Sequence, residues 1–176
     1  MKRASTKRIE RLTLMALLTA LSVVIGWVCK AYFTFGAIRI TFENLPIILS
    51  GIALGPFAGA AVGIATDIIS ALLSGYAINP LITIGAAAVG LVAGIVSRPI
   101  YNRKGFLKAL LVTMSAHGVG TMLIKTFALW KMGYAFQLCL LRIPTYLVIG
   151  VVEAYMIYNL MKNKHLAAKL GGGKRK

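Results

Sequence analysis

Six apolar runs divide this 176-residue sequence, and they constrain its fold more than any other feature. A helix needs roughly 20 predominantly apolar residues to cross a bilayer, with a range of about 17–25. The runs cover residues 12–29, 45–55, 57–75, 79–101, 107–130 and 136–161. The second run is short for a full crossing, although part of the preceding loop can extend it. The sequence therefore predicts an all-α polytopic membrane protein, built as a bundle of six transmembrane helices.

Composition supports the membrane class and argues against an ordinary soluble domain. Hydrophobic residues make up 59% of the chain and charged residues only 14%, whereas soluble domains average roughly 45–50% and about 25%. The apolar runs are too numerous for one signal peptide, and no small-residue cleavage site followed by a soluble chain comes after the first. We therefore expect no cleaved targeting segment and a single membrane domain over residues 1–162.

The positive charge gathers on one side of the predicted bundle. The net charge is +16, and 15 of the 20 Lys and Arg residues precede the first run, fill the connection 98–108 or follow the last run. This distribution is typical of cytoplasmic loops, so it predicts both termini in the cytoplasm and argues against a nucleic-acid partner. The connections 31–44, 75–79 and 131–135 would then face outside. We expect residues 163–176 to form a basic, disordered cytoplasmic tail.

Three charged side chains from three different runs fall at one depth. Asp67, Lys125 and Arg142 each lie a few residues below an outer helix end, which places them roughly 8–12 Å below the outer surface. Lone charges are costly in lipid but tolerable around a polar cavity. The sequence therefore predicts a polar pocket that opens to the outside. Two other interpretations stay open: Asp67 and Arg142 can form a structural ion pair, and Lys125 can snorkel to the surface.

Helical spacing places further polar residues on inward faces. One stripe repeats every four residues and consists of Thr113, His117, Thr121 and Lys125. A second face consists of Arg142, Tyr146 and Glu153. We expect His117 and Glu153 to have structural roles, because they lie near the middle of the membrane and in its inner half.

The sequence contains no recognisable catalytic constellation. We find no phosphate-binding glycine loop with lysine, no metal-ligand cluster and no nucleophile–base–acid set. Cys29 and Cys139 fit no metal or redox spacing, and they are either free thiols or a disulfide near the outer helix ends. We therefore expect a non-catalytic protein without a cofactor, in which any ATP-driven step comes from another chain.

Three segments carry a resemblance to a known family. They are Ala16–Ala20 (ALLTA), Ile38–Gly51 (IRITFENLPIILSG) and Gly55-Pro56 with Gly59–Asp67 (GAAVGIATD). Together with six spans and a long first outer loop, they make residues 8–162 resemble the substrate-binding S components of energy-coupling factor (ECF) vitamin transporters. The resemblance is strongest to the folate-specific member of that family. The alanine segment is shared across S components and says little about the vitamin.

The resemblance implies a substrate-capture subunit in the plasma membrane of a prokaryote. Such a subunit binds its vitamin with high affinity in a pocket open to the outside, capped by the loop between the first two helices. It works with a transmembrane T component and two ATPases. Ala16 and Ala20 match the motif through which the first helix packs on the T component, so the resemblance implies this role for them.

Folate has distinct chemical requirements, and the sequence offers candidates for each. A pterin presents an amino group and a ring N–H side by side, which Asp67 or Glu43 can accept together. The anionic glutamate tail needs cations, and aromatic side chains can sandwich the rings. The candidate substrate-binding residues are Arg39, Glu43, Asn44, Asp67, Tyr76, Asn79, Lys125, Trp130, Arg142 and Tyr146.

Three alternatives to a folate carrier remain open at this point. The same scaffold can serve another vitamin, such as riboflavin, thiamin or a pyridoxal-type compound. A small membrane enzyme acting on lipid would need clustered acidic or histidine side chains. The chain has only 4 Asp and Glu residues, which argues against this alternative. A purely structural or assembly protein would not explain three charges in one buried layer.

Overall fold

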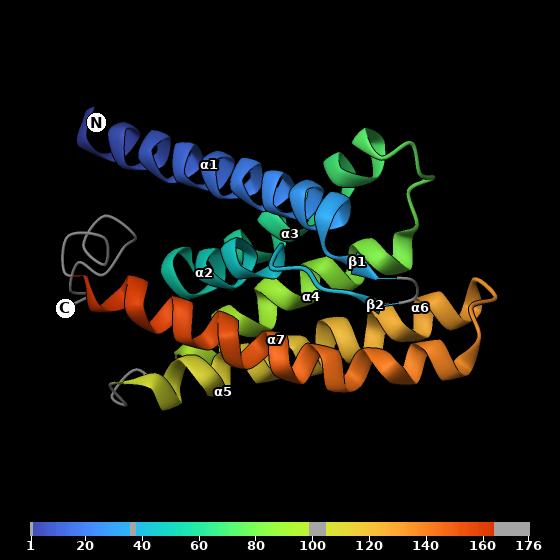
Figure 1. Cartoon of the computed structure of the whole chain (residues 1–176). Coiled ribbons are helices and arrows are strands. Elements are labelled where there is room, and N and C mark those ends of the chain that lie inside the picture. Colours follow the sequence, from blue (N-terminus) through green and yellow to red (C-terminus); the bar gives the residue numbers. More distant parts are fainter. Residues whose placement is uncertain (1, 36–37, 99–104, 164–176) are drawn as a thin grey trace.

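The structure is a bundle of helices whose long axes run side by side (Figure 1). This computed structural model describes residues 2–35, 38–98 and 105–163. The elements in chain order are α1 (Lys2–Tyr32), β1 (Thr34–Phe35), β2 (Ile38–Arg39), α2 (Asn44–Leu54), α3 (Pro56–Leu73), α4 (Pro80–Ser97), α5 (Phe106–Ala116), the π-helix η1 (His117–Lys125), α6 (Thr126–Lys131) and α7 (Phe136–Lys162). The expected tail falls almost entirely on residues 164–176, which lie outside the described residues.

Five helical segments are long and apolar enough to cross a membrane. They are Arg8–Tyr32, Pro56–Leu73, Pro80–Ser97, Phe106–Lys131 and Leu141–Lys162. The prediction of a helical membrane protein is therefore confirmed, but a count of six full spans is not. The second predicted span is the 11-residue helix α2, which rises only about 16 Å and reaches roughly half-way through a bilayer core.

A short antiparallel ladder qualifies the all-α prediction. It lies in the connection between α1 and α2, where Thr34 pairs with Arg39 and Phe35 pairs with Ile38. Each strand has only two residues. The ladder folds the connection back on itself over one end of the bundle (Figure 1).

Glycine, proline and one asparagine set the helix boundaries around the α2–α3 and α3–α4 turns. Gly55 separates α2 from α3 with φ of 99°, a conformation that residues with a side chain rarely adopt. Pro56 and Pro80 occupy first turns, where the missing N–H costs nothing. Asn79 caps α4, because its Oδ1 accepts a hydrogen bond from the backbone N–H of Leu81 at 2.9 Å.

Small residues bring α3 and α4 into backbone contact. A Cβ added at Gly59 would lie 2.5 Å from the carbonyl oxygen of Gly90, and one added at Gly63 would collide with the carbonyl of Ala86. Close approach of this kind is how helices pack in lipid. As a result, Asp67 on α3 lies beside the first turn of α4.

The two ends of the bundle differ in what they carry. α1 begins and α7 ends at the same end, whereas the ladder and the α3–α4 and α6–α7 connections lie at the opposite end (Figure 1). This arrangement agrees with termini on one side of a membrane. Which side faces the cytoplasm stays a prediction from the charge distribution.

Candidate functional site

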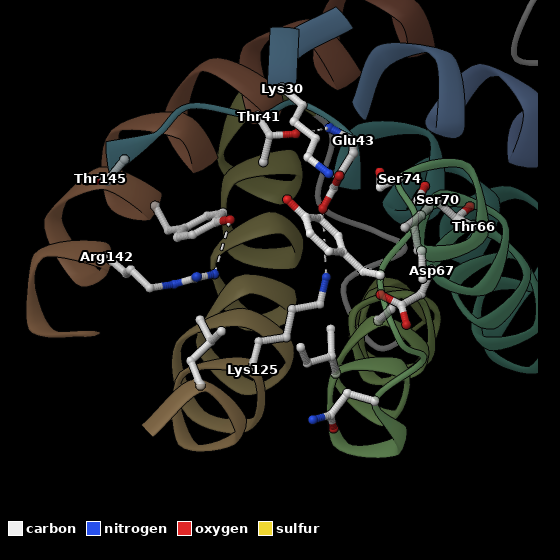
Figure 2. Close-up of a pocket in the computed structure, with 18 of the residues that line it drawn as sticks. Lys30, Thr41, Glu43, Thr66, Asp67, Ser70, Ser74, Lys125, Arg142 and Thr145 are labelled. Atoms are coloured by element: carbon white, nitrogen blue, oxygen red, sulfur yellow. Dashed lines mark hydrogen bonds and ion pairs between the residues drawn. The ribbon is translucent and has the colours of Figure 1, made fainter. Parts of the chain in front are cut away.

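A cavity of about 240 Å³ opens at the end of the bundle that carries the ladder. Its walls come from α1, the connection before α2, and α2, α3, α4, η1, α6 and α7. Seven of the ten candidate substrate-binding residues line it: Glu43, Asp67, Tyr76, Asn79, Lys125, Arg142 and Tyr146. The three charges expected at one depth therefore surround one cavity. In Figure 2, Asp67 and Arg142 project from opposite sides of it.

The wall formed by α3 and α4 presents hydrogen-bond acceptors and hydroxyl groups. Thr83 donates a hydrogen bond from Oγ1 to Oδ2 of Asp67 at 2.7 Å. Ser70 and Ser74 continue the same face of α3 toward the end of the helix and also line the cavity. Sequence reasoning missed Thr83. The short turn between α3 and α4 was the available signal, because it makes the last turns of one helix face the first turn of the next.

The opposite wall carries the cations. Arg142 lies on α7, where its Nη2 donates a long hydrogen bond of 3.4 Å to the hydroxyl of Tyr146. Its Nε is buried and has no partner within the described chain. Lys125, on η1, lies with Nζ 3.9 Å from Oε1 of Glu43. The alternative of a structural Asp67–Arg142 ion pair is not realised among the described residues.

The connection that carries Glu43 is held against α1. The hydroxyl of Ser22 donates to the backbone carbonyl of Glu43. Gly26 leaves room for the Glu43 side chain, because a Cβ there would come within 2.8 Å of Oε2. Lys30, also on α1, places Nζ 3.9 Å from the ring centre of Tyr76. α1 thus supports the connection between α1 and α2, which forms the roof of the cavity. The sequence did not indicate this role.

Three candidate residues do not contribute a described side chain to the cavity. Asn44 is fully buried at the start of α2 and is not part of the lining. Trp130 is 53% exposed and its ring packs near that of Phe127, so it faces outward like a residue of an interfacial belt. The backbone of Arg39 forms the ladder, but its side chain lies outside the described part of the chain. The structure therefore gives no support to ligand contact by Asn44 or Trp130.

The lining residue Asn79 has a second use. Its side-chain oxygen is engaged as the cap of α4, which leaves its amide N–H groups as the donors it can offer to a ligand. Its predicted role as a hydrogen-bonding residue is therefore restricted to donation.

Behind the cationic wall lies a fully buried pair of polar side chains. Nε2 of His117, on η1, is 2.6 Å from Oε2 of Glu153, on α7. Both side chains have no exposed surface. The ring of His117 also lies against that of Tyr146, with centroids 5.5 Å apart. The residues of the four-residue stripe are all buried, as its spacing predicts.

The alanine pair on α1 points away from the bundle. Ala16 and Ala20 are both exposed, whereas Leu18 and Ser22 on the same helix are buried. Cys29 is a buried free thiol, and the side chain of Cys139 lies outside the part that the structure describes. The exposed alanines leave a flat strip on α1 that a second helix can approach closely.

Comparison with known proteins identifies a family for most of the chain. The family model for "ECF transporter, substrate-specific component" matches residues 10–162, which is most of the chain. Among curated proteins, none matches the sequence closely enough to count as a relative.

Proposed function

Because this chain belongs to the family of substrate-specific components of ECF transporters, we propose that its cavity captures folate from outside the cell. Membership makes the chain a substrate-binding, non-catalytic membrane subunit that serves an ECF transporter. The choice of folate rests on the chemistry of the cavity walls. The cell would be prokaryotic, and the subunit would sit in its plasma membrane.

One observation carries the proposal: the cavity has an acceptor wall and a cationic wall that face each other. Asp67 supplies two carboxylate oxygens on one side, and Arg142 supplies a guanidinium on the other. Folate has matching ends, since its pterin offers two adjacent N–H donors and its glutamate tail is anionic. A carboxylate and a guanidinium each form paired hydrogen bonds with such groups. Tyr76 and Tyr146 line the cavity between these walls and can pack on the rings.

The size of the cavity bears on how the ligand would enter. Ligand pockets commonly measure about 300–1,000 Å³, and this one measures about 240 Å³. Folate is larger than the described space, so part of the ligand would displace the roof formed by the connection between α1 and α2. This agrees with the capping role that we propose for that connection.

Delivery would require partners. We propose that Ala16 and Ala20 pack against a transmembrane T component and that two ATPases supply the energy. The exposure of both alanines supports this assignment. Copurification of the chain with a T component and an ATPase pair would separate a transport subunit from an assembly protein.

A different vitamin is the second candidate, and one observation favours it. Lys125 is already paired with Glu43, so one of the cations in the cavity is partly neutralised. Riboflavin, thiamin or a pyridoxal-type compound would need fewer cationic side chains as partners than the glutamate tail of folate does.

The test is a calorimetric titration of the purified, detergent-solubilised protein with folic acid, with riboflavin and thiamin as controls. Tight binding of folic acid alone would support the proposal. Tight binding of one of the other vitamins, with none of folic acid, would keep the transport role and overturn the choice of ligand.

Thr83→Val is expected to weaken folic acid binding at least about tenfold, because a hydrogen bond to a carboxylate contributes about 1.5–3 kcal/mol. Valine keeps the shape of the side chain but removes the donor to Asp67. The same titration measures the effect. Thr83→Ser keeps the hydroxyl and should stay within about twofold of the wild type; a similar loss in both variants would argue against orientation by this bond.

A further inference from the structure

A row of touching side chains connects the buried core to the cationic wall of the cavity. Its members, from the core outward, are Glu153, His117, Tyr146 and Arg142. We infer that this polar row positions the guanidinium of Arg142 and thereby sets the preference of the cavity for anionic ligands. The inference rests on the proposed function, because it assumes that Arg142 meets the anionic part of the ligand.

The first contact fixes the imidazole. A single proton between Nε2 of His117 and Oε2 of Glu153 makes this 2.6 Å contact a hydrogen bond, and the bond fixes the orientation of the imidazole. The other ring nitrogen, Nδ1, lies 3.4 Å from the hydroxyl oxygen of Thr121. A fully buried charged or polar pair adds little stability beyond that of well-packed apolar side chains. Stability alone therefore does not account for this pair.

The second contact transfers this orientation to the cavity. The rings of His117 and Tyr146 lie at 36° with centroids 5.5 Å apart. Gly150 makes room for the imidazole, since a Cβ there would lie 3.3 Å from its Cδ2. Tyr146 is 6% exposed and lines the cavity. Its ring is thus held from behind by the imidazole and faces the ligand space on its other side.

The third contact reaches the cation. The guanidinium carbon of Arg142 lies 5.3 Å from the ring centre of Tyr146, in range for a cation–π interaction. Nη2 also reaches the tyrosine hydroxyl. Within the described chain, Arg142 has no carboxylate partner, and its Nε is unpaired. Tyr146 is therefore the side chain that sets where the guanidinium points.

The helices explain why the row is continuous. On α7, Arg142, Tyr146 and Glu153 are spaced by four and seven residues, so they share one face. Only His117 comes from another element, the π-helix η1. π-helical turns are rare and occur frequently at functional sites. Here the π-helix places the imidazole between Tyr146 and Glu153.

This arrangement predicts a selective effect rather than a general one. If the row loosens, the guanidinium loses its fixed direction and binds an anion less well. The contacts that Asp67 makes on the opposite wall do not depend on the row. A ligand without an anionic tail still meets Asp67 and the ring of Tyr146, so its affinity should fall much less than that of folic acid.

Glu153→Gln tests the row, because glutamine keeps the size of the side chain and removes the acid group that contacts His117. We expect the affinity for folic acid to fall about tenfold, while the affinity for 6-hydroxymethylpterin, which lacks the tail, stays within about twofold of the wild type. Thr113→Val is the matched control: Thr113 is also fully buried, on the same stripe as His117, and is not a member of the row. An equal loss for both ligands in Glu153→Gln would overturn the inference.

A double-mutant comparison separates positioning from a structural role. In an Arg142→Gln background, Glu153→Gln should cause no further loss of folic acid affinity. A second tenfold loss there would contradict positioning through Arg142. If Glu153→Gln does not fold, Tyr146→Phe replaces it, because it keeps the ring and removes only the hydroxyl partner of Arg142.

A readout without ligand keeps this inference separate from the choice of folate. The chain has 2 histidines, so His165→Gln leaves His117 as the sole histidine signal in NMR spectra of isotope-labelled protein. Tyr146→Leu should shift the His117 ring protons, because a neighbouring aromatic ring is lost. Unchanged ring signals would overturn the row. Failure of the wild type to bind folic acid would overturn the proposed function. The NMR result would still show whether the rings of His117 and Tyr146 are in contact.

Discussion

Asp67→Ala is expected to lower the affinity for folic acid at least about a hundredfold, a cost of about 3 kcal/mol. The carboxylate is the sole acidic group on the α3–α4 wall of the cavity within the described chain. Without it, the two adjacent donors of a pterin would be buried against a wall that offers only hydroxyl groups. Unpaired buried donors of this kind are costly.

The same substitution should do little harm to the fold, which makes the binding result interpretable. Thr83, the partner of Asp67, has a second acceptor in the backbone carbonyl of Asn79 at 3.2 Å. Asp67→Asn is a second test variant, similar in size to the wild-type residue. It should also lose affinity, because the amide group offers one acceptor and one donor that repels the pterin donors. Calorimetry measures both variants and a melting curve checks folding; folic acid affinity that stays unchanged in folded Asp67→Ala would refute a pterin contact at this residue.

Gly63→Leu is expected to prevent assembly of the bundle. Even a Cβ at Gly63 would collide with the backbone carbonyl of Ala86, and a backbone atom cannot move aside as the end of a side chain can. α3 and α4 would have to separate, which would cost several kcal/mol of packing and would also detach Asp67 from Thr83. We expect little or no monodisperse protein in size-exclusion chromatography after detergent extraction.

Gly118→Ala is the matched control for this experiment. Apart from the backbone of its own helix and its chain neighbours, no atom of the described residues lies within 4 Å of a Cβ added at Gly118, and alanine favours a helix over glycine by up to about 1 kcal/mol. The variant should therefore match the wild type in yield and elution. A well-folded Gly63→Leu protein that binds ligand as the wild type does would show that the α3–α4 packing described above is wrong.

The cavity could be predicted from the sequence because depth along a helix follows directly from residue count. Asp67, Lys125 and Arg142 lie at similar distances from their helix ends, and a fixed rise per residue places them in one layer. The cost of charge in lipid then requires them to face inward. Neither the depth of a residue nor the cost of a charge in lipid depends on which helices are neighbours.

The parts that the sequence did not predict depend on packing between elements. The bond from Thr83 to Asp67 exists because glycines bring α3 against α4. The rotation of a helix near its end decides whether a residue faces the cavity, and it turns Trp130 outward. The length of α2 was ambiguous for a related reason: the polar residues before it form a turn and a ladder rather than an extension of the helix.

Two faces of α1 have different contacts. One face supports Glu43 through Ser22 and Gly26, and another exposes Ala16 and Ala20. If a partner docks on the alanines and shifts this helix, the roof of the cavity shifts with it. Thermodynamic reciprocity then requires that an occupied cavity change the affinity for that partner by the same factor. Loaded and empty subunits would then bind that partner with different affinities.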